Sequence, residues 1–433
     1  AHQEVQRHRA PHQASTDGRQ QRQERHHHPP QQRTVDPQRP KGQAAQRALG
    51  DRHHHIAFHR RADHGGEFIE QGTALAFLQR QPMADFFGNH PAIAQEKPTV
   101  RWRMAASFPK SLDTCYGSTA DMCKRVGELT DGKFTISLHA PGELVPALDV
   151  MKAVSGGTLE CGQAFSTFYY GLNPAFMFDA GLAFGLNPRQ QMAWMYYGGG
   201  LELMRELYGK YDCYPIPIGN FGVAMGGWFR KEIKSLADLK GLKMRIGGFG
   251  GMVMSRMGVT AQQIAGGEIY PAMEKGTIDA AEFVGPYDDE KLGLNKVAKY
   301  YYSPGWWEGS AQMTALINTK AWAALPRAYQ SAIEVAAHEA YTSMLARYDA
   351  KNPGALRSLI AKGTQLRWFP KDVMDAAYKH SNELFDELSA KNEDFKKIYT
   401  SWKKFRDEQT SWYRVADHYL DTYTINTLSR KRG

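Results

Sequence analysis

The chain has 433 residues, of which 42% are hydrophobic and 12% are aromatic, and its formal net charge is +9. This length supports two or three domains with sizeable cores, and because no apolar run reaches about 18 residues the sequence predicts no membrane-spanning helix. The charge is spread along the chain, with 14 basic against 10 acidic residues in 1–97 and 40 against 35 in the rest, so it does not indicate a nucleic-acid-binding surface.

Residues 1–97 differ in composition from the rest of the chain. They contain 12 of the 16 His and also 15 Gln, and aromatic and β-branched residues are sparse up to about residue 56. Such a segment buries too little apolar surface to fold alone, so we expect it to be disordered. Ala92-Ile93-Ala94 has the small-x-small form of a signal-peptidase site, but no apolar run precedes it. We interpret 1–97 as a non-native N-terminal extension or a miscalled signal region.

From Val100 onward, short strands alternate with amphipathic helices. The pattern predicts strands in "VRWRMAAS", "KFTISLHA" and "TLECGQAF", and helices over about 111–129 and in "ALDVMKAVSGG". Two helices follow in 187–211, and "CYPIPIGN" is the next strand. This alternation predicts an α/β fold with largely parallel sheets.

The second half begins with the same alternation and ends in helices. Strands are predicted in "VAMGGWF", "LKMRIGG" and "DAAEFVG", with helices between them, and "YYYSPGWWEGSAQMTALIN" is predicted to be extended. After Pro326 the chain is mostly helical, interrupted by one strand in "GTQLRWFP". Four cysteines occur, which we expect to be buried free thiols, with a Cys161–Cys213 disulfide left open.

Familiar catalytic motifs are incomplete in this sequence. "SFPK" fits Ser-x-x-Lys but lacks its partner motifs, "HEAYT" lacks the second histidine of a zinc motif, and "GGFGG" lacks the lysine of a phosphate-binding loop. Only four histidines follow residue 97, which leaves few candidates for a general base.

Three charged residues, Arg245, Glu282 and Glu308, each fall at or near the end of a predicted strand. Ligands of open α/β sheets bind at the carboxyl ends of strands, and an arginine there can hold a carboxylate through two parallel hydrogen bonds. Two carboxylates would repel the same anion unless a cation lies between them, and hard cations prefer oxygen ligands. The pattern therefore favours a site for an anion together with a cation.

The acidic stretch 282–290 divides into two parts. Asp288, Asp289 and Glu290 follow Pro286 at a predicted helix start, where acidic side chains interact favourably with the helix dipole. We interpret these three as structural, and we expect their substitution to change ligand and metal binding by no more than about 0.5 kcal/mol, as for ordinary surface changes.

Several segments together closely resemble one protein family. They are "ASFPKSLDT", "APGELVPALD", "MGGWFRKEI", "LKGLKMRIGGFGG", "QQIAGGEIYPAMEKGTIDAAEFVGPYDDEKLG" and "YYYSPGWWEG". They are similar to the periplasmic solute receptors of TRAP (tripartite ATP-independent periplasmic) transporters, the DctP-like family, and within it to the α-keto-acid-binding branch. The resemblance covers 98–433 and none of 1–97.

This resemblance implies a two-lobe, periplasmic-binding-protein-like α/β fold with hinge strands, a spanning helix and a long C-terminal helix. Lobe 1 would comprise 98–222 and about 306–352, lobe 2 would comprise 223–305 and about 353–400, and 401–433 would be a dimerisation helix. The receptor would be a periplasmic homodimer that delivers a small carboxylate to the membrane permease subunits.

The resemblance also assigns roles at the site. Arg245 would clamp the ligand carboxylate, and Glu282, the backbone carbonyl of Phe283 and Glu308 would hold a sodium or calcium ion. The family places further wall residues at Phe168, Tyr169, Ala224 and Met225.

Two departures from the branch bear on the ligand. The branch has a glutamine where this chain has Ala224, and a tyrosine where it has Phe168. Phe283 replaces a tryptophan, which a backbone ligand tolerates. The pocket is therefore expected to take a carboxylate larger or more apolar than pyruvate.

The leading interpretation is a receptor for a 2-oxo or 2-hydroxy carboxylate bound with a cation. The alternative is a metal-dependent enzyme acting on keto acids, since an arginine and a cation can also polarise a carbonyl; a general base near the ligand would distinguish it. Nucleic-acid binding through the basic N-terminus is a third hypothesis.

Overall fold

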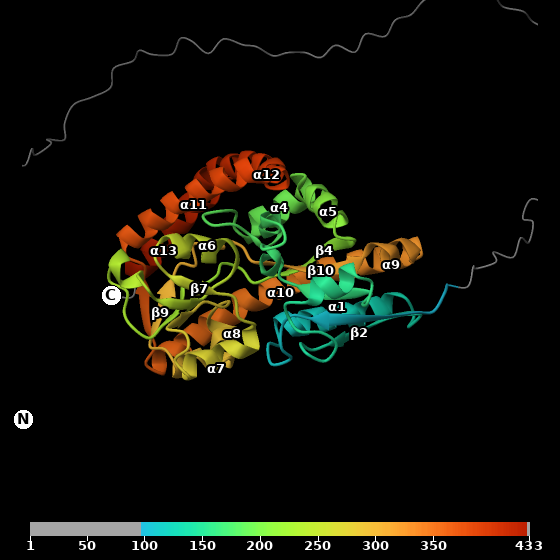
Figure 1. Cartoon of the computed structure of the whole chain (residues 1–433), viewed down its shortest axis with the longest axis horizontal. Helices are drawn as coiled ribbons and strands as arrows, with labels where there is room; N and C mark the ends of the chain where they lie inside the picture. The colour runs from blue at the N-terminus through green and yellow to red at the C-terminus, as the bar shows by residue number, and fades with distance from the viewer. Residues whose placement is uncertain (1–96, 431–433) are drawn as a thin grey trace, which may run out of the picture. The chain divides into compact units, whose positions relative to one another are not determined.

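The computed structural model describes residues 97–430, with side chains described as far as residue 428. The predictions for 1–97 therefore lie almost entirely outside the described residues. The described chain forms two sheets covered by helices, arranged as two lobes (Figure 1). No helix within 97–430 is long and apolar enough to cross a membrane.

The sheet of the first lobe has five strands in the order β2-β1-β3-β10-β4. Their bounds are β1 Val100–Ala106, β2 Phe134–His139, β3 Cys161–Ala164, β4 Cys213–Asn220 and β10 Gln312–Asn318. The sheet of the second lobe has six strands in the order β11-β9-β5-β8-β6-β7. Their bounds are β5 Gly227–Phe229, β6 Lys243–Arg245, β7 Thr260–Gln262, β8 Ala280–Ala281, β9 Tyr300–Ser303 and β11 Gln365–Trp368.

Each sheet contains one strand that is antiparallel to both of its neighbours. In the first lobe this strand is β10, and in the second it is β5. The other pairs are parallel. In each sheet all strands but one therefore run in the same direction, which agrees with the prediction of largely parallel sheets. In sequence order, each of these two strands is the first strand of its sheet after the chain has crossed from the other lobe.

The helices pack around these sheets. In the first lobe they are α1 Cys115–Leu129, α2 Val150–Ser155, α3 Met177–Ala180, α4 Pro188–Tyr197, α5 Gly200–Gly209 and α9 Thr319–Ala324. In the second lobe they are α6 Gly248–Arg256, α7 Ile269–Glu274 and α8 Pro286–Lys291. The C-terminal helices are α10 Arg327–Ala361, α11 Lys371–Lys391, α12 Glu393–Tyr413 and α13 Tyr419–Arg430, with a π-helical segment, Arg414–His418, before the last.

Two crossing segments between the lobes pair with each other and form a hinge. The segment 221–226 follows β4, and the segment 304–311 follows β9. Backbone hydrogen bonds join Phe221 N to Ala311 O at 2.9 Å, Gly305 N to Ala224 O at 2.9 Å, and Gly226 N to Tyr302 O at 2.7 Å. The adjacent Gly227 has a positive φ of 88°, and a Cβ there would meet the carbonyl of Ala281 at 2.7 Å, so only glycine fits.

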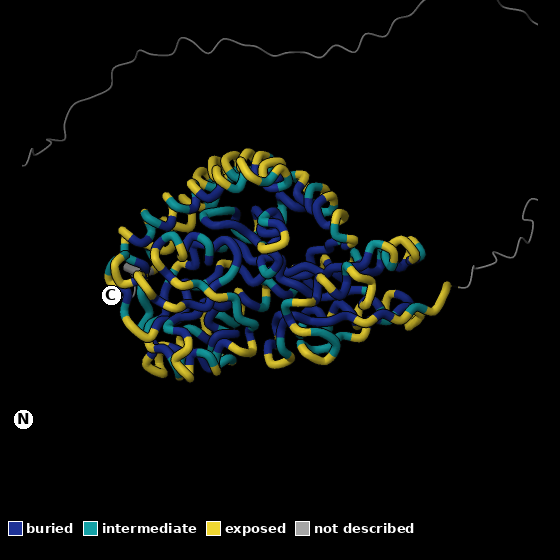
Figure 2. Tube along the Cα trace, in the orientation of Figure 1, coloured by how far each residue is buried: buried dark blue, intermediate teal, exposed yellow. Residues whose placement is uncertain are grey.

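Helices also connect the lobes. Helix α10 packs against α1 and β4 of the first lobe and against α8 of the second. Helix α11 packs on α6, and α12 continues onto α4 and α5, so this pair forms an arch over both lobes in Figure 1. Figure 2 shows that the arch exposes its outer side while the interior of each lobe is buried.

The inner side of the arch is anchored by aromatic packing. Phe395 and Trp402 of α12 are fully buried and lie near Phe178, with ring centroids 4.8 and 6.0 Å from that ring. Burying an aromatic side chain contributes roughly 2–3 kcal/mol of transfer free energy. The C-terminal helices are therefore part of the monomer's core as far as Trp402.

The four cysteines are buried and free, which confirms the prediction of free thiols and removes the open Cys161–Cys213 alternative. The predicted strands and helices of 100–430 all occur, with β7 as a strand that the pattern did not reveal. The residue bounds predicted for the two lobes remain a prediction.

Candidate functional site

An enclosed cavity lies between the two lobes and beside the hinge. The centre of a water molecule can reach ≈ 20 Å³ of this cavity, so in this arrangement of the lobes it has room for about one water molecule. It is lined by Phe108, Phe165, Thr167, Phe168, Phe221, Ala224, Arg245, Ile246, Gly247, Gln263, Glu282, Phe283, Val284, Trp307, Glu308 and Ala311. Both lobes and both crossing segments contribute, so the cavity depends on how the lobes close.

Strand ends carry two of the charged groups to this cavity. Arg245 is the last residue of β6, Glu282 follows β8, and these strands are parallel neighbours in which Arg245 pairs with Ala281. The carboxyl ends of parallel strands lie at one edge of the sheet, and ligands of α/β folds bind there. Glu308 comes from the crossing segment between β9 and β10.

Arg245 is 4% exposed and is held at two of its nitrogens. Its Nε donates to the carbonyl of Ile264 at 3.1 Å, and its Nη1 donates to the carbonyl of Glu282 at 2.7 Å and also to the Glu282 carboxylate. Nη2 has no hydrogen-bond partner among the described residues. A guanidinium oriented in this way keeps one donor nitrogen for an anion.

The two carboxyl groups at the cavity interact unfavourably with each other. Burial raises the pKa of Glu282, and the guanidinium of Arg245 opposes that effect only in part. Burial also raises the pKa of Glu308 well above its usual range; the neighbouring Glu282 raises it further, and Arg245 opposes both. Within 97–430, the Glu308 carboxyl group has no hydrogen bond or ion pair, so a negative charge on it is uncompensated and its protonated form is favoured until a cation binds.

This arrangement fits a hard cation. Two carboxylates that disfavour each other's ionisation are stabilised by a positive charge between them, and the oxygen donors suit calcium or sodium. Among the described residues, no group of three or more His, Cys, Asp or Glu side chains forms a self-contained metal site. A cation held here would therefore need backbone and ligand oxygens in addition to Glu282 and Glu308.

The remaining wall of the cavity is mostly aromatic. Phe108 lies at the centre, with ring centroids 6.3 Å from Phe168, 5.6 Å from Phe221 and 6.4 Å from Phe283. Phe165 packs against Phe168 and Phe221 at 5.7 and 5.6 Å. These rings exclude water, which strengthens electrostatic interactions inside the cavity.

The structure brings most of the predicted site residues together. Phe168, Ala224, Arg245, Glu282, Phe283 and Glu308 all line the cavity. Tyr169 and Met225 do not: the Tyr169 hydroxyl accepts from Met151 N at 3.2 Å, and Met225 N donates to the carbonyl of Val284 at 3.1 Å. The structure therefore places these two beside the cavity walls rather than in them.

Sequence reasoning missed several lining residues. Phe108 and Phe221 are typical core residues, and nothing in their local pattern separates them from other buried phenylalanines. Gln263 follows a strand of three residues, Thr260–Gln262, which is too short to show a period. Its position beside a strand-end arginine is the only signal that could have identified it.

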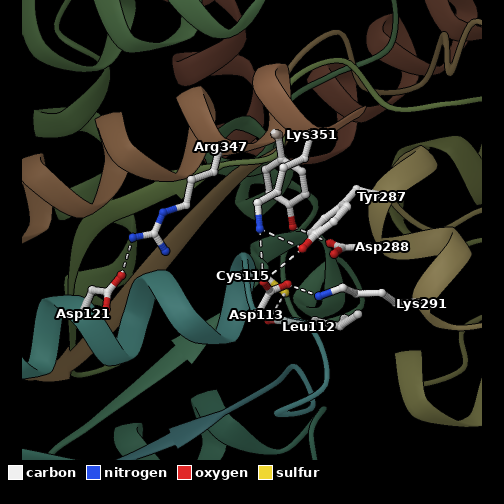
Figure 3. A network of polar contacts seen from close by, with 10 residues as sticks. Leu112, Asp113, Cys115, Asp121, Tyr287, Asp288, Lys291, Arg347 and Lys351 are labelled. Carbon is white, nitrogen blue, oxygen red and sulfur yellow. Dashed lines mark hydrogen bonds and ion pairs between the residues drawn. The ribbon is translucent and has the colours of Figure 1, made fainter. Parts of the chain in front are cut away.

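A polar network joins the lobes away from the hinge (Figure 3). Asp113 of the first lobe accepts hydrogen bonds from Tyr287 at 3.0 Å and from Lys351 at 3.2 Å, and it also pairs with Lys291. Partial burial opposes its ionisation, but these donors outweigh that effect and lower the pKa of Asp113 to about 2. Because Tyr287 and Lys291 belong to α8, these contacts help to hold the closed arrangement.

Two of the acidic residues of α8 differ from the prediction made for them. The prediction that Asp288 and Asp289 behave as surface residues is wrong, because both are at most 1% exposed. Asp289 accepts from Trp228 Nε1 at 2.9 Å, from the Tyr301 hydroxyl at 2.7 Å and from Val284 N at 3.3 Å. It therefore anchors the loop that carries Glu282 and Phe283.

Asp288 and Glu290 have different surroundings. Asp288 accepts from the Tyr348 hydroxyl, while its Oδ1 is buried without a partner in the described chain. Glu290 accepts from Ser358 Oγ at 2.6 Å and from Lys362 Nζ at 2.7 Å, near the surface. None of the three α8 acids lines the cavity, so the division of the stretch between cavity and helix start agrees with the structure.

Comparison with known proteins identifies the family. Residues 105–392 match the bacterial extracellular solute-binding proteins, family 7, also called DctP. The chain belongs to this family.

Three relatives show its range. A monocarboxylate 2-oxoacid-binding periplasmic protein of Nostoc is 50% identical over 315 residues, which are 73% of this chain and 86% of that protein. The crystal structure of a TRAP solute-binding protein of Bordetella bronchiseptica is 62% identical, with a TM-score of 0.76 over 77% of this chain and all of that one; it is a mixed-occupancy dimer with copurified calcium and picolinate. A TRAP periplasmic solute-binding protein of Pseudoalteromonas atlantica, with sodium and pyruvate, is 37% identical, with a TM-score of 0.73 over 75% of this chain and 99% of that one.

Replacing the buried Asp288 with asparagine tests whether this carboxyl is held protonated. Burial raises the pKa of Asp288 to about 7, whereas an aspartate of an unfolded chain ionises near about pH 3.9. The free energy of unfolding should therefore fall as pH rises from about 4 to about 7, by up to about 1.4 kcal/mol per pH unit from this group. Asp288→Asn keeps an oxygen for Tyr348 but cannot ionise, so its stability profile should be flatter.

Urea unfolding at intervals between about pH 5 and about pH 8 measures the difference. Asp121→Asn is the control, because Asp121 lies at the surface and pairs with Arg347. Parallel profiles for the Asp288→Asn variant and the unmodified protein would contradict the assignment.

Proposed function

We propose that this protein is the periplasmic solute receptor of a TRAP transporter, which binds a small 2-oxo or 2-hydroxy carboxylate together with a calcium or sodium ion. The observation that carries the proposal is the convergence of Arg245, Glu282 and Glu308 on one enclosed cavity between the lobes. The 2-oxoacid-binding relative supports it, as do the relatives that hold picolinate with calcium and pyruvate with sodium. Family membership favours this binding role over the enzymatic alternative, and over nucleic-acid binding.

Each residue of the site would have a separate role in binding. A bound cation supplies the positive charge that the two carboxylates need. Glu282, once engaged by the cation, no longer needs Nη1 of Arg245, which then joins the free Nη2 as a two-nitrogen clamp for the ligand carboxylate. Phe283 offers its backbone carbonyl as a further oxygen ligand. Closure of the lobes excludes water from this set of charges.

The apolar wall points to the kind of ligand. Ala224 is 4% exposed and lies against the crossing segment that carries Glu308, where a methyl group stands in place of the longer glutamine side chain of the branch. Five phenylalanines surround the charged groups. A flat aromatic carboxylate such as picolinate, whose ring nitrogen and carboxylate can share one cation, matches this combination, so we expect preference for acids larger than pyruvate.

The partners follow from the family and from one exposed surface. Val415, Tyr419 and Tyr423 recur every four residues and are 73, 75 and 66% exposed. This spacing puts them on one helical face, and a second copy of the chain is the partner we propose for it, consistent with the dimeric Bordetella relative. The membrane permease subunits would receive the ligand.

Replacing the clamp arginine tests the anion site. Arg245→Lys removes the planar fork and should weaken carboxylate binding by about 2–4 kcal/mol, because lysine cannot form two parallel hydrogen bonds. Titration calorimetry with pyruvate and with picolinate, in calcium or sodium buffer, measures the loss. Arg256→Lys, a surface residue of α6 paired with Glu387, should change neither affinity. Unchanged affinity of the Arg245 variant would remove this residue from the site.

Replacing a cation ligand should weaken cation and carboxylate binding together. Glu308→Gln deletes one of the two carboxylates, and the loss should be about 1–3 kcal/mol for each, since each stabilises the other in the cavity. Calcium content after gel filtration and calorimetry with picolinate provide the two readouts. Glu290→Gln, on α8 outside the cavity, is the matched control. Loss of carboxylate binding with full retention of calcium would separate Glu308 from the cation.

Restoring a glutamine tests what sets the pocket size. Ala224→Gln fills volume and adds an amide, and it should shift preference from picolinate toward pyruvate by about 1–2 kcal/mol. Thermal-shift titrations with 2-oxo acids of increasing size measure the shift, and Val223→Gln, at a neighbouring residue that is 57% exposed, is the control. If the unmodified protein binds pyruvate most tightly, Ala224 does not determine the preference.

A further inference from the structure

Gln263 lies next to the arginine of the site in an arrangement that the backbone fixes. It follows β7, whose last residue, Gln262, pairs with Arg245 on β6. The residue after it, Ile264, accepts a hydrogen bond from Arg245 Nε at 3.1 Å. Gln263 is therefore held between two residues that are tied to Arg245, and its side chain lines the same cavity.

The amide nitrogen of Gln263 reaches across to the other lobe. Nε2 donates to the backbone carbonyl of Phe168 at 3.1 Å, and Phe168 belongs to the first lobe. Because a carbonyl oxygen can only accept, this bond fixes which end of the amide is the nitrogen. The side chain thus links the lobes at the cavity and has a defined orientation.

The amide oxygen of Gln263 is left without a partner. Oε1 is buried and accepts no hydrogen bond from any described residue. It lies close to Gly247, where a Cβ would come within 2.7 Å of it, and Gly247 also lines the cavity. A buried acceptor without a partner costs about 1–3 kcal/mol, so a partner present only in the loaded cavity would recover that cost.

The other groups in the cavity limit what that partner can be. Glu282 and Glu308 are acceptors when ionised, a 2-oxo carboxylate brings only further acceptors, and a 2-hydroxy carboxylate brings a single hydroxyl donor. The lining also contains donors that are not used by other residues, Arg245 Nη2, Trp307 Nε1 and the Thr167 hydroxyl, but none of them forms a hydrogen bond with Oε1 among the described residues. With one guanidinium, two carboxylates and the ligand carboxylate, the formal charge would be +1 − 2 − 1 = −2. A divalent cation balances this charge, and an amide oxygen is among the ligands that calcium accepts.

We propose that Gln263 is an additional ligand of the bound cation and at the same time an interlobe contact. Its Oε1 contributes a neutral oxygen to the cation, and its Nε2 holds the carbonyl of Phe168, so cation binding and lobe closure are coupled through one side chain. This inference rests on the proposed receptor function.

Two substitutions separate the roles of the two amide atoms. Gln263→Leu removes both the oxygen and the nitrogen, whereas Gln263→Glu keeps an oxygen ligand, gains a negative charge and loses the donor to Phe168. Gln262→Leu is the control, because Gln262 is the exposed neighbour on β7. Each protein is stripped of metal with a chelator, and its folding is checked by its melting temperature.

Calcium binding is then measured by calorimetry and by displacement of terbium, whose luminescence Trp307 at the cavity can sensitise. Each measurement is made first without a carboxylate and then with excess pyruvate or picolinate. Gln263→Leu should weaken calcium binding about tenfold or more, in line with the loss of groups that support a metal site. Gln263→Glu should bind calcium within about threefold of the unmodified protein but bind the carboxylate less tightly, because the interlobe bond is lost. Gln262→Leu should behave as the unmodified protein.

The outcomes distinguish this inference from the function on which it rests. Calcium binding by Gln263→Leu equal to that of the unmodified protein overturns the proposal. Equal losses of calcium affinity in Gln263→Leu and Gln263→Glu also overturn it, because they would leave Gln263 as an interlobe contact only. If the unmodified protein binds neither carboxylate in calcium or in sodium, the receptor function itself fails.

Discussion

The buried ion pair between Arg245 and Glu282 is the interaction around which the cavity is organised. It leaves Glu308 without a compensating charge in a space surrounded by phenylalanine rings. In such surroundings ionisation of a second carboxyl group has a high free-energy cost, which a bound cation removes, and the cation together with Arg245 then attracts an anion. The site therefore favours binding both partners over binding either one alone.

The fold supplies the rigidity that this charge arrangement requires. Arg245 and Glu282 end adjacent parallel strands, and Glu308 lies on a crossing segment that is hydrogen bonded to its partner segment. Behind them, Asp289 accepts hydrogen bonds from β5, from β9 and from the loop at Val284. The buried Asp289 therefore helps to position Glu282. Placing Arg245 and Glu282 on adjacent strand ends keeps these two groups at a fixed separation.

Closure depends on contacts made between the lobes at several places. Asp113 meets α8 and α10 in one network, Gln263 meets Phe168 at the cavity, and the α11–α12 arch packs on both lobes. The Asp113 contacts are half exposed, and such pairs contribute little individually, about 0–1 kcal/mol. A closed state held by weak peripheral contacts leaves the bound cation and carboxylate to decide how fully it is populated.

The sequence by itself determined the element order, the α/β class and the strand-end positions of Arg245 and Glu282, because hydrophobic periodicity and glycine punctuation are local signals. Resemblance to the TRAP receptors added the two-lobe arrangement and three residues of the cavity wall, Phe168, Ala224 and Phe283. Only the tertiary structure decided that Asp288 and Asp289 are buried, since a helix start looks the same in sequence whether its acids meet water or a Tyr348 hydroxyl. It also decided that Tyr169 turns its hydroxyl to Met151 and that Gln263 faces the cavity, because both depend on contacts between residues far apart in the chain.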